Sequence, residues 1–549
     1  MRKSFLCLLL AMCVCLSCLV ACDTGNTENT PTETKDTTIP DSQPETDFEA
    51  ESDTETEPED ETEPEDKTPS SIGGGSSSSS GSGGSGSGST AKPTYSKGLD
   101  FISNGDKTCY VAGIGTCTDK AVVIPPKSPQ GDRVTGIGEE AFSSCEAIES
   151  VIIPAGVTRI ERLAFINCTN LESVTFAQDS ACAYIGEWAF ENCFALTSFT
   201  VPDSVTDLAQ SVFYQCVSLR SVTFAEESPC TSLSNWLFEN CTSLEHVNLP
   251  SGITSIGEGT FYQCESLETI NLPSGITSIG RISFYKCKRL ESIRIPDAVA
   301  SIDEGAFAYC EALTSVIFSE ESLCTDIGTH VFYSCNNLQN ITLPNGVTHL
   351  GEYLFYNCSS LMAITLPDSI TSIGEWAFYF CANIENFHFP DSLESIGDAA
   401  FYHCYELASI TLPRGVTSIG IYAFGACTNL ESMQVEENNP VYHSSGNCII
   451  ETSTQTLIAG CSTSVIPADG SVTSLGEGSF YGFTDLESIT IPLYVSVIGS
   501  CAFEDCVNLT SITFAGTVDE WNAISKVEDW NHNVPATEVL CVGGNVSLS

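Results

Sequence analysis

The sequence predicts a β-rich α/β solenoid, in which about 15 short repeats stack on a shared hydrophobic interior. The main observation is a Phe that recurs at positions 142, 165, 190, 213, 238, 261, 284, 307, 332, 355, 378, 401, 424, 480 and 503. Of the fourteen intervals, ten are 23 residues, three are 25 and one is 56. A Cys follows three places after fourteen of these Phe residues; the exception is Phe480, which is followed by Phe483. A fixed period of about 20 to 50 residues indicates units too small to bury their own apolar face alone.

The repeat from Leu267 to Cys287 shows what one unit encodes. Ile270 and Leu272 alternate as a short strand with one face inward. Pro273 ends this strand because it has no amide hydrogen to donate to a continuing ladder. The opposite wall of the interior is filled by the remaining apolar positions, Ile276, Ile279 and Phe284.

The recurring pattern L-x-x-I-x-I-P-x-x-V-T-x-I-G-x-x-A-F-x-x-C resembles the leucine-rich repeat family. The resemblance is to the BspA-like subclass of bacterial surface lipoproteins, and it covers roughly residues 97–515. It implies a curved, right-handed leucine-rich repeat array of 23–25-residue units with a parallel sheet on its concave side. It also implies a binding role carried by the stacked surface.

Two segments precede the repeats. Residues 1–21 are expected to be a lipoprotein signal peptide, with Arg2 and Lys3 before an apolar run. Leu19-Val20-Ala21-Cys22 resembles a lipobox, which implies cleavage before Cys22 and lipid attachment there; a plain secretory signal or an uncleaved anchor is the alternative. Residues 22–90 are expected to be a disordered acidic Thr/Glu/Pro and then Gly/Ser stalk, because they offer almost nothing to bury.

The rest of the chain divides into three parts, the second of which contains an insert. Residues 91–135 are expected to form an N-terminal hairpin cap, and residues 136–515 the repeat solenoid. An irregular insert at about 434–466 accounts for the long interval, with short strands expected around 441–443, 448–450 and 457–459. The family resemblance implies that residues 516–549 form a C-terminal cap with a short helix and a final strand.

The charge balance limits the kinds of partner. The formal net charge is −51, from 71 Asp and Glu against 20 Lys and Arg. Such a chain repels phosphate groups, so nucleic acid is excluded as a partner. The expected partner is an extracellular protein or glycan, and the only expected membrane contact is through the N-terminal lipid anchor.

The outward positions of the first strand in each repeat are the candidate binding surface. Eight of these fifteen positions are Thr, which suits a solvated parallel sheet and predicts a generic ladder. The departures from Thr are where ligand specificity is expected: Asn248, Asn271, Arg294, Ile317 and His388.

The cysteines are interpreted mainly as structural. The Cys of each Phe-x-x-Cys block is expected to be buried in a ladder formed by Cys145, Cys168, Cys193, Cys216, Cys241, Cys264, Cys287, Cys310, Cys335, Cys358, Cys381, Cys404, Cys427 and Cys506. No C-x-x-C pair follows Cys22, so no metal site is predicted. The sequence leaves open whether Cys109 pairs with Cys117 and Cys448 with Cys461 in disulfides.

Enzyme chemistry finds little support. The seven His residues are scattered over different repeats, and His403-Cys404 combines a scattered His with an ordinary member of the Cys ladder. No phosphate loop or nucleophile elbow is present, so neither a catalytic residue nor a cofactor is predicted.

These observations favour a lipid-anchored binding scaffold, adhesin-like and displayed at a bacterial cell surface. The alternative is a structural envelope spacer with no specific ligand, and an enzyme is the remote alternative. The ligand, the membrane that bears the anchor and the oligomeric state do not follow from the sequence.

Overall fold

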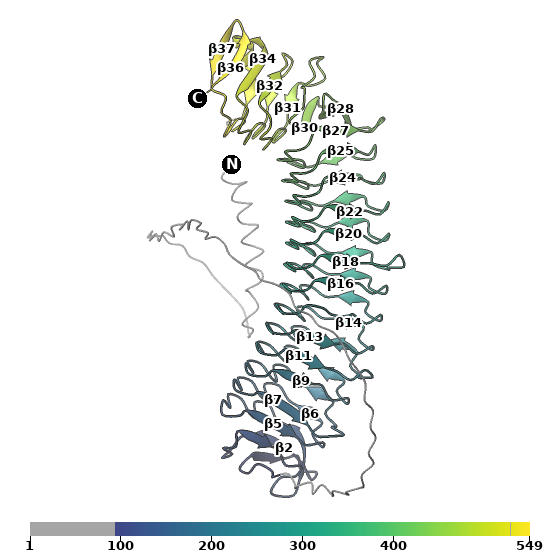
Figure 1. The fold of residues 1–549 in the computed structure, drawn as a ribbon, viewed down its shortest axis with the longest axis vertical. Coiled ribbons are helices and arrows are strands. Elements are labelled where there is room, and N and C mark those ends of the chain that lie inside the picture. The colour runs from purple at the N-terminus through teal and green to yellow at the C-terminus, as the bar shows by residue number, and fades with distance from the viewer. Residues whose placement is uncertain (1–93, 528, 549) are drawn as a thin grey trace, which may run out of the picture. The chain divides into compact units, whose positions relative to one another are not determined.

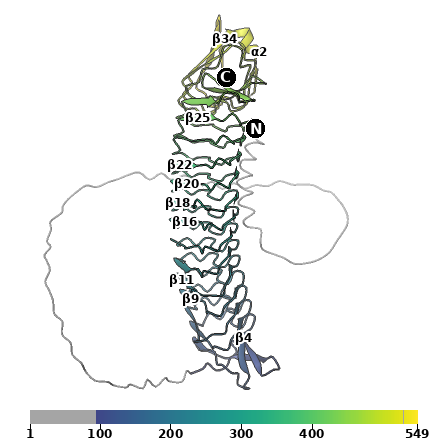
Figure 2. The same ribbon diagram turned by 90° about the vertical axis from the view of Figure 1, so that its right-hand side faces the viewer.

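The computed structural model describes residues 94–527 and 529–548. The predicted signal peptide, Cys22 and the predicted stalk lie outside these residues. The described part forms a single stack of short turns, each built from the same succession of strand, turn, strand and Phe segment (Figures 1 and 2). The predicted β solenoid of many repeats is therefore confirmed. Helix is nearly absent, since the described part contains one six-residue helix, α2 (Val518–Ala523).

The first sheet collects the strand that opens each repeat, and its paired strands run parallel along the stack. Its strands are β3 (Ala121–Val123), β5 (Ser150–Ile153), β7 (Ser173–Phe176), β9 (Ser198–Thr200), β11 (Ser221–Thr223), β13 (His246–Asn248), β16 (Ser292–Arg294), β18 (Ser315–Ile317), β20 (Asn340–Thr342), β22 (Ala363–Thr365), β25 (Ser409–Leu412), β27 (Ser432–Val435), β32 (Ser488–Ile491) and β34 (Ser511–Thr517).

Two strands expected from the sequence do not form. Residues 270–272 and residues 387–389 have no strand pairing, so the first sheet is interrupted between β13 and β16 and again between β22 and β25. Ile270 is nevertheless buried, and backbone bonds in the Phe segment hold the turn to its neighbour, with Phe261 N donating to Ser283 O at 2.7 Å. The stack keeps its register here because neither the packing of the interior nor the strand pairing in the second sheet, described next, depends on the first sheet.

The second sheet is made mostly of two-residue strands that follow each turn, and it is also parallel. Its members are β4 (Arg133–Ile137), β6 (Arg159–Ile160), β8 (Tyr184–Ile185), β10 (Asp207–Leu208), β12 (Ser232–Leu233), β14 (Ser255–Ile256), β15 (Ser278–Ile279), β17 (Ser301–Ile302), β19 (Asp326–Ile327), β21 (His349–Leu350), β23 (Ser372–Ile373), β24 (Ser395–Ile396), β26 (Ser418–Ile419), β31 (Ser474–Leu475), β33 (Val497–Ile498) and β35 (Ser525–Lys526).

A column of Phe rings runs through the interior. From Phe142 to Phe424 each ring stacks on the next, with centroids 4.9–6.0 Å apart and planes within 21° of parallel. All of these rings are at most 2 % exposed. Burying an aromatic side chain and stacking it on a neighbour both favour the folded state, so this column is a main source of stability.

The backbone around each Phe has an unusual and regular form. The residues two before and two after every repeat Phe have positive φ, as with Gly259 (φ 57°) and Gln263 (φ 57°) around Phe261. The Phe amides donate to the turn that follows, for example Phe142 N to Ala164 O at 2.8 Å. This third ladder links successive turns without forming a regular strand.

The two ends of the stack are closed differently. At the N-terminal end β1 (Asp100–Ser103) and β2 (Thr108–Gly113) form an antiparallel hairpin, and β2 also pairs with β4. At the C-terminal end Thr517 caps α2 in a capping box with Glu520, and β36 (Glu538–Val542) and β37 (Gly544–Ser547) extend the first sheet.

The 56-residue interval contains three antiparallel strands, β28 (Tyr442–Ser445), β29 (Cys448–Glu451) and β30 (Thr456–Ala459). They lie where the sequence places extra strands. β30 then pairs with β31, so this insert joins the section of the second sheet that contains β31, β33 and β35.

Candidate binding surface

The outward residues of the first sheet form a row, called here the strand row. All of its Thr members are exposed except Thr513, which is half-buried. Successive members lie opposite each other in parallel register, as Thr342 and Thr365 do. The row therefore presents a surface of hydroxyl and methyl groups that is interrupted at seven positions, five of which were singled out in the sequence.

These five positions are not equivalent. Arg294 and Ile317 are exposed and lie directly opposite each other in register. Asn248 has a structural role, because its side-chain Nδ2 donates to Phe224 O at 2.8 Å and its Oδ1 accepts from Phe224 N at 3.0 Å. Asn271 and His388 are exposed but lie in turns without a strand. The structure thus places Arg294 and Ile317 together, with Asn271 one turn away and His388 three turns beyond Ile317.

The Phe-x-x-Cys cysteines face the interior. Thirteen of the fourteen are buried, and their Sγ atoms donate to the Phe carbonyl of the preceding turn at 3.0–3.4 Å. Cys145, which has no such turn before it, is half-buried. Each of these Phe carbonyls except that of Phe480 also accepts a hydrogen bond from the Cys amide three residues later in the same turn. Phe165 O, for example, accepts from Cys193 Sγ and, at 3.2 Å, from Cys168 N.

These thiols are poor nucleophiles in the folded chain. Burial raises the pKa of Cys168 to about 12 and the pKa of Cys404 well above its ordinary range, because the thiolate would lose its hydration. Cys404 donates to Phe378 O at 3.2 Å, and burial lowers the pKa of the neighbouring His403. All 23 cysteines of the described residues are free thiols, including Cys109, Cys117, Cys448 and Cys461.

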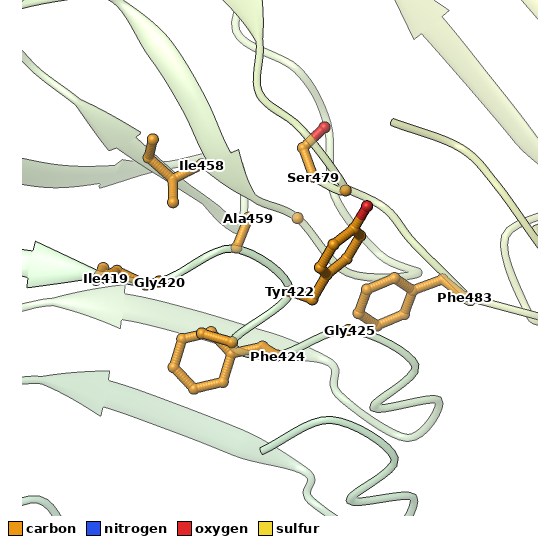
Figure 3. Close-up of a pocket in the computed structure, with 12 residues that line it drawn as sticks. Ile419, Gly420, Tyr422, Phe424, Gly425, Ile458, Ala459, Ser479 and Phe483 are labelled. Carbon is orange, nitrogen blue, oxygen red and sulfur yellow. The ribbon is translucent and has the colours of Figure 1, made fainter. Parts of the chain in front are cut away.

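Two hollows lie at the insert. A cavity of about 10 Å³ sits between the turns of Phe424 and Phe480, with Tyr422 and Phe483 on its wall (Figure 3). This volume admits one water molecule at most. A shallower hollow of about 270 Å³ opens where the insert meets β27 and is lined by Gln434, Ser444, Ser445, Gly446, Asn447, Thr463 and Val465.

A second surface was not predicted from the sequence. Tyr directly follows the repeat Phe in eight repeats, and Trp or Tyr stands two places before it in several. In the structure several of these rings, together with Tyr309 two places after Phe307, form a continuous half-exposed column. This column is called here the aromatic flank: Trp236, Tyr262, Tyr285, Tyr309, Tyr333, Tyr353, Tyr356, Trp376, Tyr379 and Tyr402. The repeated Phe-Tyr dipeptide is the signal that would have revealed it.

Metal clusters and membrane-spanning helices are both missing from the part of the chain that the structure describes. Within residues 94–527 and 529–548, no group of three or more His, Cys, Asp or Glu side chains is arranged to hold a metal ion. The helix content of this same region includes nothing with the length and hydrophobicity needed to cross a bilayer.

The fold and its surfaces define the class as a leucine-rich repeat solenoid. The model of the BspA type leucine-rich repeat region matches residues 135–253, 231–361, 325–449 and 451–525, which together span most of the chain. The chain therefore belongs to the BspA-type leucine-rich repeat family. No curated protein matches it.

Solved structures from bacteria are similar to this chain. A leucine-rich repeat protein from Bacteroides ovatus is 27% identical, with a TM-score of 0.52, and the match covers 62% of this chain and 94% of that one. A leucine rich cell surface protein from Faecalibacterium prausnitzii is 26% identical, with a TM-score of 0.39, over 79% of this chain and 98% of that one.

Proposed function

We propose that this protein is a lipid-anchored scaffold at the bacterial cell surface that binds an extracellular protein or glycan through the strand row. Family membership supports a binding scaffold. The observation that carries the proposal is the exposed pair Arg294 and Ile317, set side by side in a row otherwise dominated by Thr. An exposed aliphatic residue beside a cation gives the row a local chemistry that a generic ladder lacks.

Binding to arrays of matrix proteins, mucins and envelope glycans tests this proposal, with the full chain as analyte. The decisive variant replaces four departures by the majority residue: Asn271→Thr, Arg294→Thr, Ile317→Thr and His388→Thr. Asn248 is left unchanged because its amide bridges the Phe224 backbone. We expect saturable binding that weakens at least about tenfold, equivalent to about 1.4 kcal/mol.

The matched control changes four other members of the same row: Thr200→Ser, Thr342→Ser, Thr365→Ser and Thr411→Ser. It should keep the original affinity. Equal binding by both variants would remove the strand row as the site, and no saturable binding to any probe would favour the structural spacer.

The anchor is tested separately. Lipid attachment at Cys22 is expected to incorporate labelled palmitate in cells, and Cys22→Ala should abolish this incorporation and release the protein from membranes. A protein that remains membrane-bound without label would contradict the lipid anchor but leave the binding role intact.

A further inference from the structure

The aromatic flank is bordered by a column of mostly charged residues, three places before each repeat Phe. In two stretches of this column, an arginine is paired with the glutamates of the turns before and after it. Arg162 Nη1 lies 3.0 Å from Glu139, and its Nε lies 4.0 Å from Glu187 in the turn on the other side. Arg281 repeats this arrangement, at 3.0 Å from Glu258 and 3.4 Å from Glu304.

Arg162 also makes a cation–π contact with an aromatic ring. The guanidinium carbon of Arg162 lies 5.1 Å from the centroid of Trp188, which stands two places before Phe190 in the next turn. A cation over a Trp face is favourable. The chain itself therefore shows how this flank accommodates a guanidinium: between two carboxylates and against a Trp ring.

A third stretch of the column has acidic residues in three successive turns and no arginine between them. Glu352, Glu375 and Asp398 occupy the column in three successive turns, and Glu375 stands where Arg162 and Arg281 stand in the other two. Within the described residues none of these three carboxylates forms an ion pair, although Asp398 Oδ1 accepts from Ile421 N at 2.8 Å. Burial, and then the charges of Asp398 and Glu352, raise the pKa of Glu375.

Trp376 precedes its repeat Phe by two places, as Trp188 does. Trp188 lies one turn beyond Arg162, whereas Trp376 directly follows Glu375 in the same turn. Trp376 lies parallel to Tyr353, with centroids 6.2 Å apart. Both residues have positive φ, 59° and 57°, a conformation that is unfavourable for bulky side chains. The equivalent residue in three other turns is Gly259, Gly305 or Gly478. The stack thus tolerates glycine here, and this stretch carries large rings at a backbone cost.

We propose that the aromatic flank around Trp376 and Tyr353 binds an extended, Arg- or Lys-rich segment of another protein, whose cationic side chains lie between Glu352, Glu375 and Asp398. Turns of a parallel stack are about 4.8 Å apart, so the three carboxylates span about 10 Å. Alternate residues of an extended chain are about 6.6 Å apart, so two cationic side chains on one face of the segment fit within that span.

The same observations disfavour other occupants. A second copy of this chain, with a net charge of −51, would be repelled. A glycan commonly packs on an exposed ring face, whereas Tyr333, Tyr356 and Tyr379 cover one another's faces with centroids 4.6 and 4.5 Å apart. This surface is separate from the strand row, so the inference does not depend on the function proposed above.

Fluorescence anisotropy of labelled 12-residue peptides with the full chain tests the inference. The probes are (Arg-Ser)6, (Gln-Ser)6 and (Glu-Ser)6, at about 150 mM salt so that long-range attraction is screened beyond about 8 Å. We expect binding of (Arg-Ser)6 that is at least tenfold tighter than that of (Gln-Ser)6, and no binding of (Glu-Ser)6.

Glu375→Arg is the decisive variant because it installs the arginine that the other two stretches already have. It should retain the melting temperature and weaken (Arg-Ser)6 binding at least tenfold. Glu394→Arg makes the same charge change at an exposed position just before β24 in the second sheet, and it should alter affinity less than twofold. Equal losses in the two variants would show non-specific attraction to an acidic protein and overturn the inference.

Two further results separate this site from the strand row. Trp376→Ala should weaken (Arg-Ser)6 binding at least threefold. The strand-row variant in which four residues are replaced by Thr should bind this peptide with the original affinity. Preferential binding of (Gln-Ser)6, or full affinity in both Glu375→Arg and Trp376→Ala, would contradict the proposed segment.

Discussion

Successive turns are joined differently in the regular stack, which runs up to Phe424, and at the junction, where the insert separates the turn of Phe424 from the turn of Phe480. In the regular stack, each Phe ring lies on the next and the Phe amides donate across to the following turn. At the junction, Gly460 from the insert donates to Ser479 O at 2.8 Å, in the place that the Phe424 amide would take. The cavity of about 10 Å³ lies at this point.

The comparison shows that the ladders of the solenoid are separable. Residues 270–272 lose strand pairing while ring stacking continues through Phe261 and Phe284. At the junction the backbone link persists, with Ala426 N donating to Tyr481 O at 2.8 Å. Each turn is held by several independent contacts, so one can fail without ending the stack.

The largest expected effect comes from removing a ring from the regular column. Phe307→Ala should destabilise the protein by about 3–5 kcal/mol, because it leaves a cavity between two stacked neighbours. Phe424→Ala should cost about half as much, since this ring stacks on one repeat Phe only, Phe401. Thermal unfolding followed by circular dichroism measures both, and equal losses would contradict the distinction between stack and junction.

A smaller effect is expected where the insert crosses the core. A Cβ added to Gly460 would lie 2.2 Å from Cε1 of the buried Phe480 ring. Gly460→Ala should therefore cost about 1–3 kcal/mol through overpacking. Gly131 is the control, because its Cβ would meet no atom within 4 Å, although its φ of 95° adds strain to Gly131→Ala. Hydrogen exchange should show the Gly460 variant opening first around β30 and β31.

The smallest effect concerns the thiol ladder. Cys310 donates to Phe284 O at 3.2 Å, so Cys310→Ala should cost about 1 kcal/mol. Cys145→Ala should change stability by less than about 0.5 kcal/mol, because no earlier Phe turn offers Cys145 an acceptor. Urea denaturation of both variants, compared at one pH, checks this difference. A larger loss at Cys145 would show that the thiols act only by filling volume.

Much of the fold was predictable because the repeat imposes the same contacts many times. The Phe spacing alone identifies the stacked interior. The Pro that ends the strand segment in most repeats marks the turn, where Ile276 N donates to Pro273 O at 3.2 Å. The missing strand at residues 270–272 could not be predicted, since its sequence alternates as its neighbours do. Strand pairing depends on small shifts between turns that no single repeat encodes.

The candidate surfaces were predictable only in part. Alternation along a strand places Arg294 and Ile317 outward, and parallel stacking at a fixed period places them side by side. The two hydrogen bonds between the Asn248 side chain and the Phe224 backbone were not predictable, because they depend on the distance to the previous turn. The aromatic flank was missed because its residues lie in turns with positive φ, where no simple alternation tells which side chains point outward.

The thiol ladder has a consequence for the life of the protein outside its folded state. In the native stack, oxidants meet almost no thiolate, because burial holds the protons on sulfur. An unfolded chain would expose more than twenty cysteines with ordinary acidity, each free to be oxidised or to form mispaired bridges. Rapid folding of successive turns thus also protects the cysteines from oxidation, and oxidative damage should concentrate on molecules that have not finished folding.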